Sequence, residues 1–276
     1  MRQWWCDANV FVPSEDFLLN AVAFGDPSHP VFLAHGGWVG SWELWQEPFQ
    51  LMQQDWRCIS YDHRGAGATT ASPAQVSPQG LVDDVMRVLD FFGVDSCVLA
   101  GESLGAVTAM STALQHPDRI RGLVLVDGLA SAGTTAPHPM IAGCRTDYGA
   151  TVQWFIDACM PEPDSEHLRR WGRQILLRAE PEAAARMFES YDEQPATPRA
   201  ALINQPTLIL HGELDVIVPP AGAHALAAVI PNADLVLIPD AGHVPTITRP
   251  QAVVDAVNEW WGTRHPSQTS PSTLES

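Results

Sequence analysis

The residues with the clearest chemical potential surround Ser103, in the pentapeptide Gly-Glu-Ser-Leu-Gly at positions 101–105. An apolar run precedes this Gly-x-Ser-x-Gly pattern and an amphipathic stretch follows it. That context is typical of a sharp strand-to-helix turn that exposes the serine hydroxyl. A serine hydroxyl is a weak nucleophile and needs a general base, together with an acid that orients the base. The pattern therefore predicts nucleophilic chemistry at Ser103, with partners elsewhere in the chain.

The predicted base is His243, which lies in a Gly-His-Val-Pro segment between the last apolar run and the last amphipathic stretch. Asp215 follows the apolar run at 207–210 and is the predicted acid. The resulting chain order of serine, aspartate and histidine is one of the known orders of a Ser-His-Asp triad. Asp127 also ends an apolar run and is an alternative acid.

Backbone N–H groups must stabilise the oxyanion that forms when a serine attacks a carbonyl group. Leu104 begins the predicted helix after the nucleophile, and its N–H is the first expected donor. The second is expected from the loop His-Gly-Gly-Trp at 35–38. We favour the N–H of Gly37 there, with the N–H of Trp38 as the alternative.

Four residues are predicted to line a substrate pocket: Trp38, Glu102, Trp154 and Phe155. Trp38 adjoins the oxyanion loop, while the other two aromatic residues lie in a region rich in bulky apolar side chains. Glu102 adjoins the nucleophile, and we expect a contact at the surface or the pocket rim rather than proton transfer. His211 ends an apolar run and is expected to satisfy loop backbone.

These residues need a scaffold that brings strand ends together, and the apolar runs indicate one. Runs at 31–34, 56–61, 96–100, 122–126, 207–210 and 233–238 have the length of strands buried on both faces. Amphipathic stretches at 79–92, 106–115 and 250–261 alternate with them. This alternation predicts an α/β fold with a doubly wound, mostly parallel sheet. In such a sheet a ligand binds beyond the carboxyl ends of the strands.

The alternation stops between 131 and 201, where three helices are expected at 151–159, 165–178 and 181–191. An interruption of this length exceeds an ordinary connection and predicts a helical cap. The α/β core would then comprise residues 1–130 and 202–262. The segment 263–276 is rich in Ser, Thr and Pro and is predicted to be a disordered tail.

These motifs together resemble the α/β-hydrolase fold family, most closely its cofactor-free serine esterase and lactonase branch with a helical cap. The resemblance implies that Ser103 attacks a carbonyl, that His243 takes the proton and that Asp215 orients the histidine. Ser103 lies at the strand-to-helix turn that the family calls the nucleophile elbow. Haloalkane dehalogenases and epoxide hydrolases have aspartate at this position, so the serine disfavours dehalogenation and epoxide hydrolysis. The matching segments are VFLAHGGW (31–38), SYDHRGAGAT (60–69), LAGESLG (99–105), LVLVDG (123–128), LILHGELDVIVP (208–219) and AGHVPTITRP (241–250).

Composition limits the possible partners. Of 276 residues, 46% are hydrophobic and 17% are charged, as in a globular protein. The chain has 15 Lys and Arg against 32 Asp and Glu, a net charge of −17, which argues against nucleic acid or an anionic membrane as a partner. No apolar stretch is long enough to span a membrane. The five cysteines are expected to be reduced thiols in a cytoplasmic protein without a signal peptide.

We therefore predict a serine hydrolase whose partner is a small-molecule ester or lactone with an apolar, medium-sized group. The resemblance implies a reaction that requires no metal and no organic cofactor. Phosphate-loop, His-Glu-x-x-His and dinucleotide-binding patterns are absent from the sequence. One alternative keeps the triad but cleaves a thioester or a C–C bond in a vinylogous diketone, or acts as a perhydrolase. C–C hydrolases of this family usually have a longer glycine-rich oxyanion loop. Another alternative is a ligand receptor with slow turnover. The sequence makes no prediction of oligomeric state.

Overall fold

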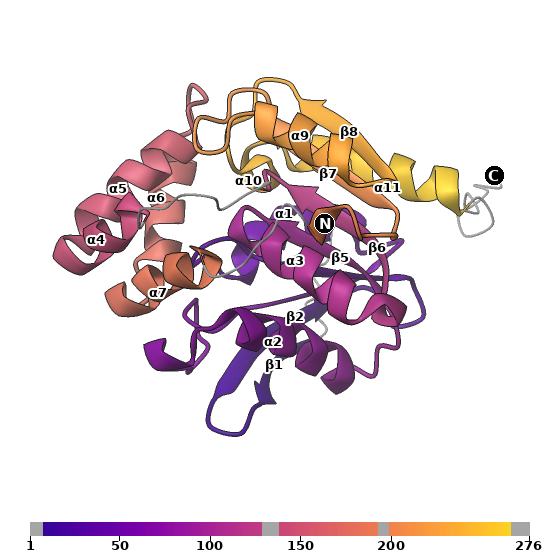
Figure 1. Ribbon diagram of the computed structural model, residues 1–276, viewed down its shortest axis with the longest axis horizontal. Coiled ribbons are helices and arrows are strands. Elements are labelled where there is room, and N and C mark those ends of the chain that lie inside the picture. The colour runs from indigo at the N-terminus through magenta and orange to yellow at the C-terminus, as the bar shows by residue number, and fades with distance from the viewer. Residues whose placement is uncertain (1–7, 129–137, 193–198, 266–276) are drawn as a thin grey trace, which may run out of the picture.

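The computed structural model describes residues 8–128, 138–192 and 199–265, which form one eight-stranded sheet with helices on both faces (Figure 1). The strands lie in the order β1-β2-β4-β3-β5-β6-β7-β8. Every pairing between two of the strands β3 to β8 is parallel, so the prediction of a mostly parallel α/β fold is confirmed. The bounds are β1 Ala8–Pro13, β2 Leu18–Phe24, β3 Val31–His35, β4 Arg57–Tyr61, β5 Cys97–Glu102, β6 Ile120–Val126, β7 Thr207–Gly212 and β8 Ala233–Ile238.

All six apolar runs of the sequence become strands, whereas the antiparallel hairpin of β1 and β2 is an addition that these runs do not indicate. Strand β1 alternates between more and less exposed positions, and Phe11 is 52% exposed. In β2 the polar Asn20 interrupts the apolar residues. Neither β1, which lies at the edge of the sheet, nor β2 beside it is marked by a long uninterrupted apolar run.

Alternate residues of the central strands supply two separate cores, since successive side chains of a strand point to opposite faces. Leu33 and Leu99 pack with the helices α2, α3 and α9 on one face. Their neighbours Phe32 and Val98 pack with α1, α10 and α11 on the other. The helix bounds are α1 Gln46–Met52, α2 Pro78–Phe91, α3 Leu104–Gln115, α9 Ala221–Val229, α10 Pro245–Thr248 and α11 Pro250–Arg264, with short 3₁₀ helices at Trp42–Trp45, Pro73–Gln75 and Pro117–Arg119.

Helices α4 to α7 lie between β6 and β7, and Figure 1 shows them gathered at one end of the sheet. We call residues 139–192 the helical insertion; its elements are α4 Pro139–Thr146, α5 Tyr148–Cys159, α6 Glu166–Leu176 and α7 Pro181–Asp192. The sequence pattern indicated three of them but not α4. Side-chain contacts join the insertion to the body: the indole Nε1 of Trp38 donates to the carbonyl of Ala184 at 2.9 Å. Parts of the predicted cap range, 131–137 and 193–198, lie outside the described residues.

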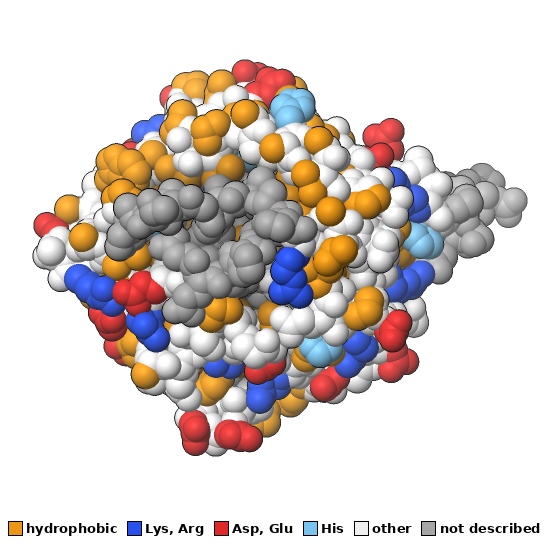
Figure 2. All heavy atoms as spheres, viewed as in Figure 1, with side chains coloured by type: hydrophobic (Ala, Val, Ile, Leu, Met, Phe, Trp, Pro, Cys, Tyr) orange, Lys and Arg blue, Asp and Glu red, His pale blue; other side chains and the backbone are white. Residues whose placement is uncertain are grey.

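The last helix extends farther than the sequence indicates. Helix α11 runs to Arg264, two residues into the segment predicted as a tail, and His265 stacks on Trp261 with ring centroids 3.7 Å apart. Residues 266–276 lie outside the described part of the chain. Among the described helices, none combines the length and the apolar character that crossing a bilayer requires. On the face shown in Figure 2, acidic side chains are spread around the edges rather than gathered in one patch.

Candidate active site

Ser103 occupies a strained turn between β5 and α3. Its φ of 53° lies in the left-handed region, which costs energy for a residue with a side chain. The Ser103 N–H donates to the carbonyl of Val126 at 2.8 Å, which holds the turn against β6. A Cβ on Gly105 would lie 2.5 Å from the carbonyl oxygen of Gly36, so only glycine fits there. The second glycine of the pentapeptide is therefore explained by a close backbone approach.

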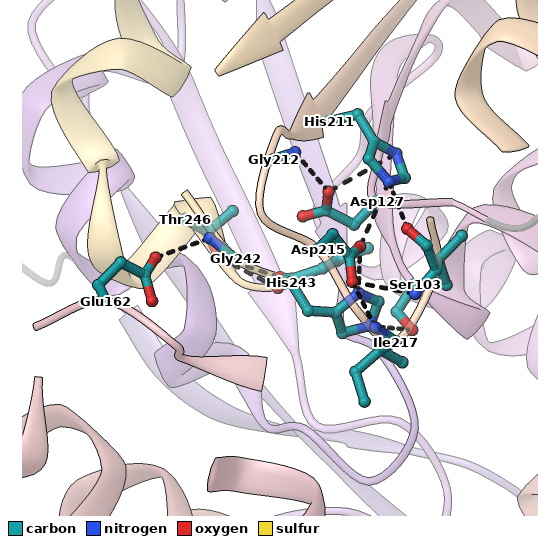
Figure 3. A network of polar contacts seen from close by, with 12 residues as sticks. Ser103, Asp127, Glu162, His211, Gly212, Asp215, Ile217, Gly242, His243 and Thr246 are labelled. Atoms are coloured by element: carbon teal, nitrogen blue, oxygen red, sulfur yellow. Dashed lines mark hydrogen bonds and ion pairs between the residues drawn. The ribbon is translucent and has the colours of Figure 1, made fainter. Parts of the chain in front are cut away.

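The structure brings the predicted nucleophile, base and acid together in one line of hydrogen bonds (Figure 3). Nε2 of His243 lies 2.9 Å from Oγ of Ser103, and Nδ1 of His243 lies 2.7 Å from Oδ2 of Asp215. With the proton on Nδ1, the imidazole donates to Asp215 and accepts from the Ser103 hydroxyl. All three side chains are buried. This is the geometry that activates a serine hydroxyl.

Asp215 is oriented by the loop that follows β7. Its Oδ1 accepts hydrogen bonds from the N–H groups of Ile217 at 2.8 Å and Val218 at 2.9 Å, which leaves Oδ2 facing His243. Burial raises the pKa of Asp215, but hydrogen bonds from His211 and His243 outweigh it and hold this pKa well below the usual value. Asp215 is therefore a carboxylate across the physiological range, as an acid that stabilises an imidazolium must be.

His211 has the backbone role expected from the sequence and lies beside the acid as well. Its Nε2 donates to the carbonyl of Val218 at 2.7 Å and lies 3.3 Å from Oδ2 of Asp215. Burial lowers the pKa of His211, yet the contacts with Asp215 and Asp127 more than offset this effect, and the pKa is raised. His211 thus supports the loop that orients Asp215.

Asp127, the alternative acid, makes no hydrogen bond to His243, whose Nδ1 is bonded to Asp215 instead. Its Oδ1 accepts the N–H of Gly212 at 2.8 Å and lies 3.6 Å from Nδ1 of His211. Burial raises the pKa of Asp127 well above the usual value, and the negative charge of Asp215 raises it further. Donor atoms of Asp127, Asp215 and His243 lie within 4.8 Å of one another, the spacing of a metal site. The Nδ1 of His243 is, however, already engaged by Asp215.

Glu102 lies in the interior beside a cavity, so of the two positions expected from the sequence, the surface is wrong and the edge of a pocket agrees with the structure. It is 1% exposed because β5 lies in the middle of the sheet, and its carboxyl group accepts a hydrogen bond from Oγ1 of Thr246 at 3.2 Å. Burial, followed by the charge of Asp127, raises the pKa of Glu102 well above its usual value. Glu102 borders a small cavity together with Ser103, but no described arginine or lysine pairs with it.

The loop at 35–38 packs directly on the nucleophile. A Cβ placed on Gly37 would lie 3.1 Å from Cβ of Ser103. The carbonyl of Gly37 accepts the N–H of Gly40 at 3.0 Å and lies 3.1 Å from Nε2 of His63. Leu104 is the first residue of α3, where backbone N–H groups have no partner within the helix. Both predicted oxyanion donors therefore lie on elements that adjoin Ser103.

Two cavities adjoin Ser103 and share the walls Trp38 and Phe155. The larger holds about 210 Å³ and lies between the nucleophile and the helical insertion. The smaller holds about 30 Å³ and extends past Glu102 toward Ile247. Further lining residues of the larger cavity are Leu104, His138, Met140, Trp154, Ala158, Phe188, Val216, Ile217 and Val218. Of these, only Leu104 and Trp154 carry a sequence-based site prediction, because no local pattern distinguishes a lining residue from one that packs the core.

This fold, with a Ser-His-Asp line at the strand ends, defines an α/β hydrolase. The sequence profile of the alpha/beta hydrolase family matches residues 31–256, and the chain belongs to that family. The resemblance drawn from the motifs is thereby confirmed, and the protein is a hydrolase.

Similar proteins are distant in sequence but span most of the chain. A protein of Klebsiella pneumoniae (strain 342) named as a carbamate hydrolase, RutD, is 26% identical over 235 residues, 80% of this chain and 87% of that protein. The 3-oxoadipate enol-lactonase 2 of Acinetobacter baylyi is 24% identical over 251 residues, 88% of this chain and 93% of that protein. A thermophilic esterase from Thermogutta terrifontis has a TM-score of 0.80 at 26% identity and covers 94% of this chain and 99% of its own.

Proposed function

We propose that this protein is a serine hydrolase that cleaves a carboxylic ester or lactone through an acyl-enzyme on Ser103. The observation that carries the proposal is the line of hydrogen bonds from Asp215 through His243 to Ser103, which ends at the wall of an apolar cavity. The family relationship and the esterase and lactonase names among the relatives support it.

In the first half of the reaction, Oγ of Ser103 bonds to the carbonyl carbon while Nε2 of His243 takes the hydroxyl proton. The carboxylate of Asp215 stabilises the imidazolium that results. The carbonyl oxygen becomes an oxyanion, which the N–H groups of Leu104 and Gly37 would bind, with the N–H of Trp38 as the alternative to Gly37. His243 then returns the proton to the alkoxide as the C–O bond breaks, and the alcohol leaves.

In the second half, water replaces the alcohol. His243 removes a proton from water, the hydroxide oxygen adds to the acyl carbon, and the same two backbone donors bind the new oxyanion. Collapse of this intermediate breaks the bond to Ser103, whose oxygen recovers its proton from His243. In a lactone the alcohol and the acid belong to one molecule, so the product is a single hydroxy acid. Every proton movement passes through Nε2 of His243, which lies 2.9 Å from Oγ of Ser103.

The larger cavity favours a neutral substrate with one apolar, medium-sized group. A cavity of about 150 Å³ accommodates a benzene ring, so the 210 Å³ beside Ser103 has room for one ring with a short substituent. Trp38, Trp154 and Phe155 would contact such a group. None of the described lining residues is an arginine or a lysine, and the chain carries a net charge of −17. A carboxylate group on the substrate would therefore lack a counter-charge in this cavity.

A labelling experiment tests the proposal directly. The wild type should react with a fluorophosphonate and hydrolyse neutral p-nitrophenyl esters and lactones, whereas Ser103→Ala and His243→Ala should do neither. Full labelling and activity in Ser103→Ala would contradict the mechanism. Thioesters and a vinylogous diketone belong on the same substrate panel, because faster turnover of either would favour the alternative reaction on the same residues. Stoichiometric acylation with very slow release would favour a ligand receptor.

A further inference from the structure

The loop that carries His243 is held by the helical insertion through two backbone hydrogen bonds. The N–H of His243 donates to the carbonyl of Cys159 at 2.8 Å, and the N–H of Gly242 donates to Oε1 of Glu162 at 2.7 Å. Figure 3 shows Glu162 reaching this loop from the side opposite to Ser103. Two consecutive amides of the loop, those of Gly242 and His243, are thus satisfied by residues about 80 positions earlier in the sequence.

The two segments touch closely enough to fix their relative position. A Cβ on Gly242 would lie 2.4 Å from the carbonyl oxygen of Cys159 and 2.4 Å from Cδ of Pro161. Both obstacles belong to backbone or a proline ring, which cannot rotate away. The glycine before His243 is therefore required by the insertion, and not by a left-handed backbone conformation.

Glu162 is an unusual residue to find at this contact. It is 2% exposed, and its second oxygen, Oε2, is buried without a hydrogen-bond partner among the described residues. Burying a carboxyl group costs free energy that an apolar side chain of the same size would avoid. Packing alone therefore does not explain a glutamate here, whereas the need for an acceptor for the Gly242 N–H does.

The segment that presents Glu162 is itself fixed in place. Oγ of Ser165 donates to the carbonyl of Glu162 at 2.7 Å. Nε of Arg169 donates to the carbonyl of Met160 at 2.9 Å, and Nη2 of the same side chain donates to the carbonyl of Glu162 at 3.2 Å. The carboxyl group is thus presented by an ordered turn between α5 and α6 rather than by a free loop.

We propose that Glu162 is a positioning residue that, with the carbonyl of Cys159, holds the His243 backbone where Nε2 can reach Ser103. The inference rests on the proposed role of His243 as general base. In this proposal the helical insertion does more than cover the substrate, because it also accepts the two hydrogen bonds that fix the backbone of the His243 loop. A displacement of about 1 Å in such a residue can cost about a hundredfold in rate.

The test compares Glu162→Met, which keeps the length but removes the acceptor, with Glu162→Gln, which keeps one. The matched control is Glu180→Ala, an exposed glutamate of the same insertion. We expect kcat of Glu162→Met to fall about ten- to a hundredfold with KM nearly unchanged, and fluorophosphonate labelling to slow in parallel. Hydrogen exchange in the peptide containing Gly242 and His243 should accelerate. Glu162→Gln should restore all three measurements, and Glu180→Ala should match the wild type.

Each other result overturns the inference. Normal kcat in Glu162→Met, or normal hydrogen exchange with reduced kcat, would show that the contact does not position the histidine. A Glu162→Gln variant as impaired as Glu162→Met would assign the effect to charge instead. Should Glu162→Met fail to fold, Glu162→Gln decides: wild-type kcat supports the acceptor role and a tenfold loss rejects it. If the wild type neither labels nor cleaves esters, the proposed function fails, while hydrogen exchange still reports whether Glu162 holds the loop.

Discussion

The nucleophile and the histidine of this site are supported in different ways. Ser103 is held by its own neighbourhood: a tight turn between β5 and α3, a glycine that permits close backbone contact, and a hydrogen bond to the adjacent strand β6. The loop of His243 also touches the core, where the Leu214 N–H donates to the carbonyl of Ala241 at 2.8 Å, but it depends on a distant segment as well. The amides of His243 and Gly242 are held by Cys159 and Glu162 from the helical insertion.

The difference shows which half of the site a short motif can encode. The elbow around Ser103 needs only its pentapeptide and a parallel sheet, so it is self-contained within the core. The histidine loop depends on an insertion far away in sequence, and a change there can alter catalysis without touching the substrate. We therefore expect the elbow to tolerate changes in the insertion better than the histidine loop does.

The largest expected effect comes from removing the nucleophile. Ser103→Ala should lower kcat by about 10⁴-fold or more, because no other hydroxyl lies in hydrogen-bond contact with Nε2 of His243 among the described residues. Ester hydrolysis with a purified variant gives the rate, and an unchanged circular dichroism spectrum shows that the elbow still folds. Residual activity above a few per cent would mean that the elbow is not the reacting centre.

The next largest effect on kcat is expected at Asp215, and the same substitution at Asp127 provides the comparison. Asp215→Asn should lower kcat about 10³- to 10⁴-fold, since an asparagine cannot stabilise the imidazolium and favours the wrong tautomer. Asp127→Asn should change kcat less than about fivefold, because its oxygen contacts the N–H of Gly212 and an amide oxygen can replace it. Steady-state kinetics of both variants at one pH decide this. The reverse ranking would make Asp127 the partner of His243.

The sequence predicted the fold and the three residues of the hydrogen-bonded Ser-His-Asp line because their signals are local. Continuous apolar runs mark strands β3 to β8, and the pentapeptide around Ser103 carries its own turn. The sequence favoured Asp215 but left Asp127 as an alternative acid, because the choice depends on which carboxylate the Ile217 and Val218 amides orient toward His243. That information lies in three-dimensional geometry.

Other features escaped the sequence for related reasons. The burial of Glu102 follows from the central position of β5, which no local pattern indicates. Glu162 belongs to no sequence motif, and its burial and its contact with Gly242 distinguish it from the surface glutamates of the insertion. The lining residues His138 and Phe188 are likewise identified only by the cavity they border. Long-range contacts thus define what the motifs leave open.

A smaller effect is expected at Arg169, which contacts the segment carrying Glu162 rather than the His243 loop itself. Arg169→Ala removes the guanidinium donors to the carbonyls of Met160 and Glu162 but leaves the Ser165 hydroxyl in place. It should therefore lower kcat about two- to fivefold, less than Glu162→Met. The neighbouring exposed Arg170→Ala is the matched control and should be neutral. Fluorophosphonate labelling rates measured side by side test this ranking. An Arg169→Ala variant that is more impaired than Glu162→Met would mean that the support does not pass through the glutamate.

The smallest effect on rate is expected where the two regions meet, at the hydrogen bond between Glu102 and Thr246. Glu102→Gln preserves an acceptor, so kcat should change less than about twofold. Stability should change instead. Burial raises the pKa of Glu102, so the folded protein keeps a proton that the unfolded chain releases above about pH 4.3.

For such a group the folded state binds more protons than the unfolded state, and the free energy of unfolding falls as pH rises above about 4.3. Glutamine does not titrate, so Glu102→Gln should remove this loss. Its melting temperature should exceed that of the wild type by a few degrees at pH 7.5, with no difference near pH 4. Thermal unfolding of both proteins across this range measures it. A variant less stable at pH 7.5 would mean that Glu102 is ionised and stabilises the junction through its charge.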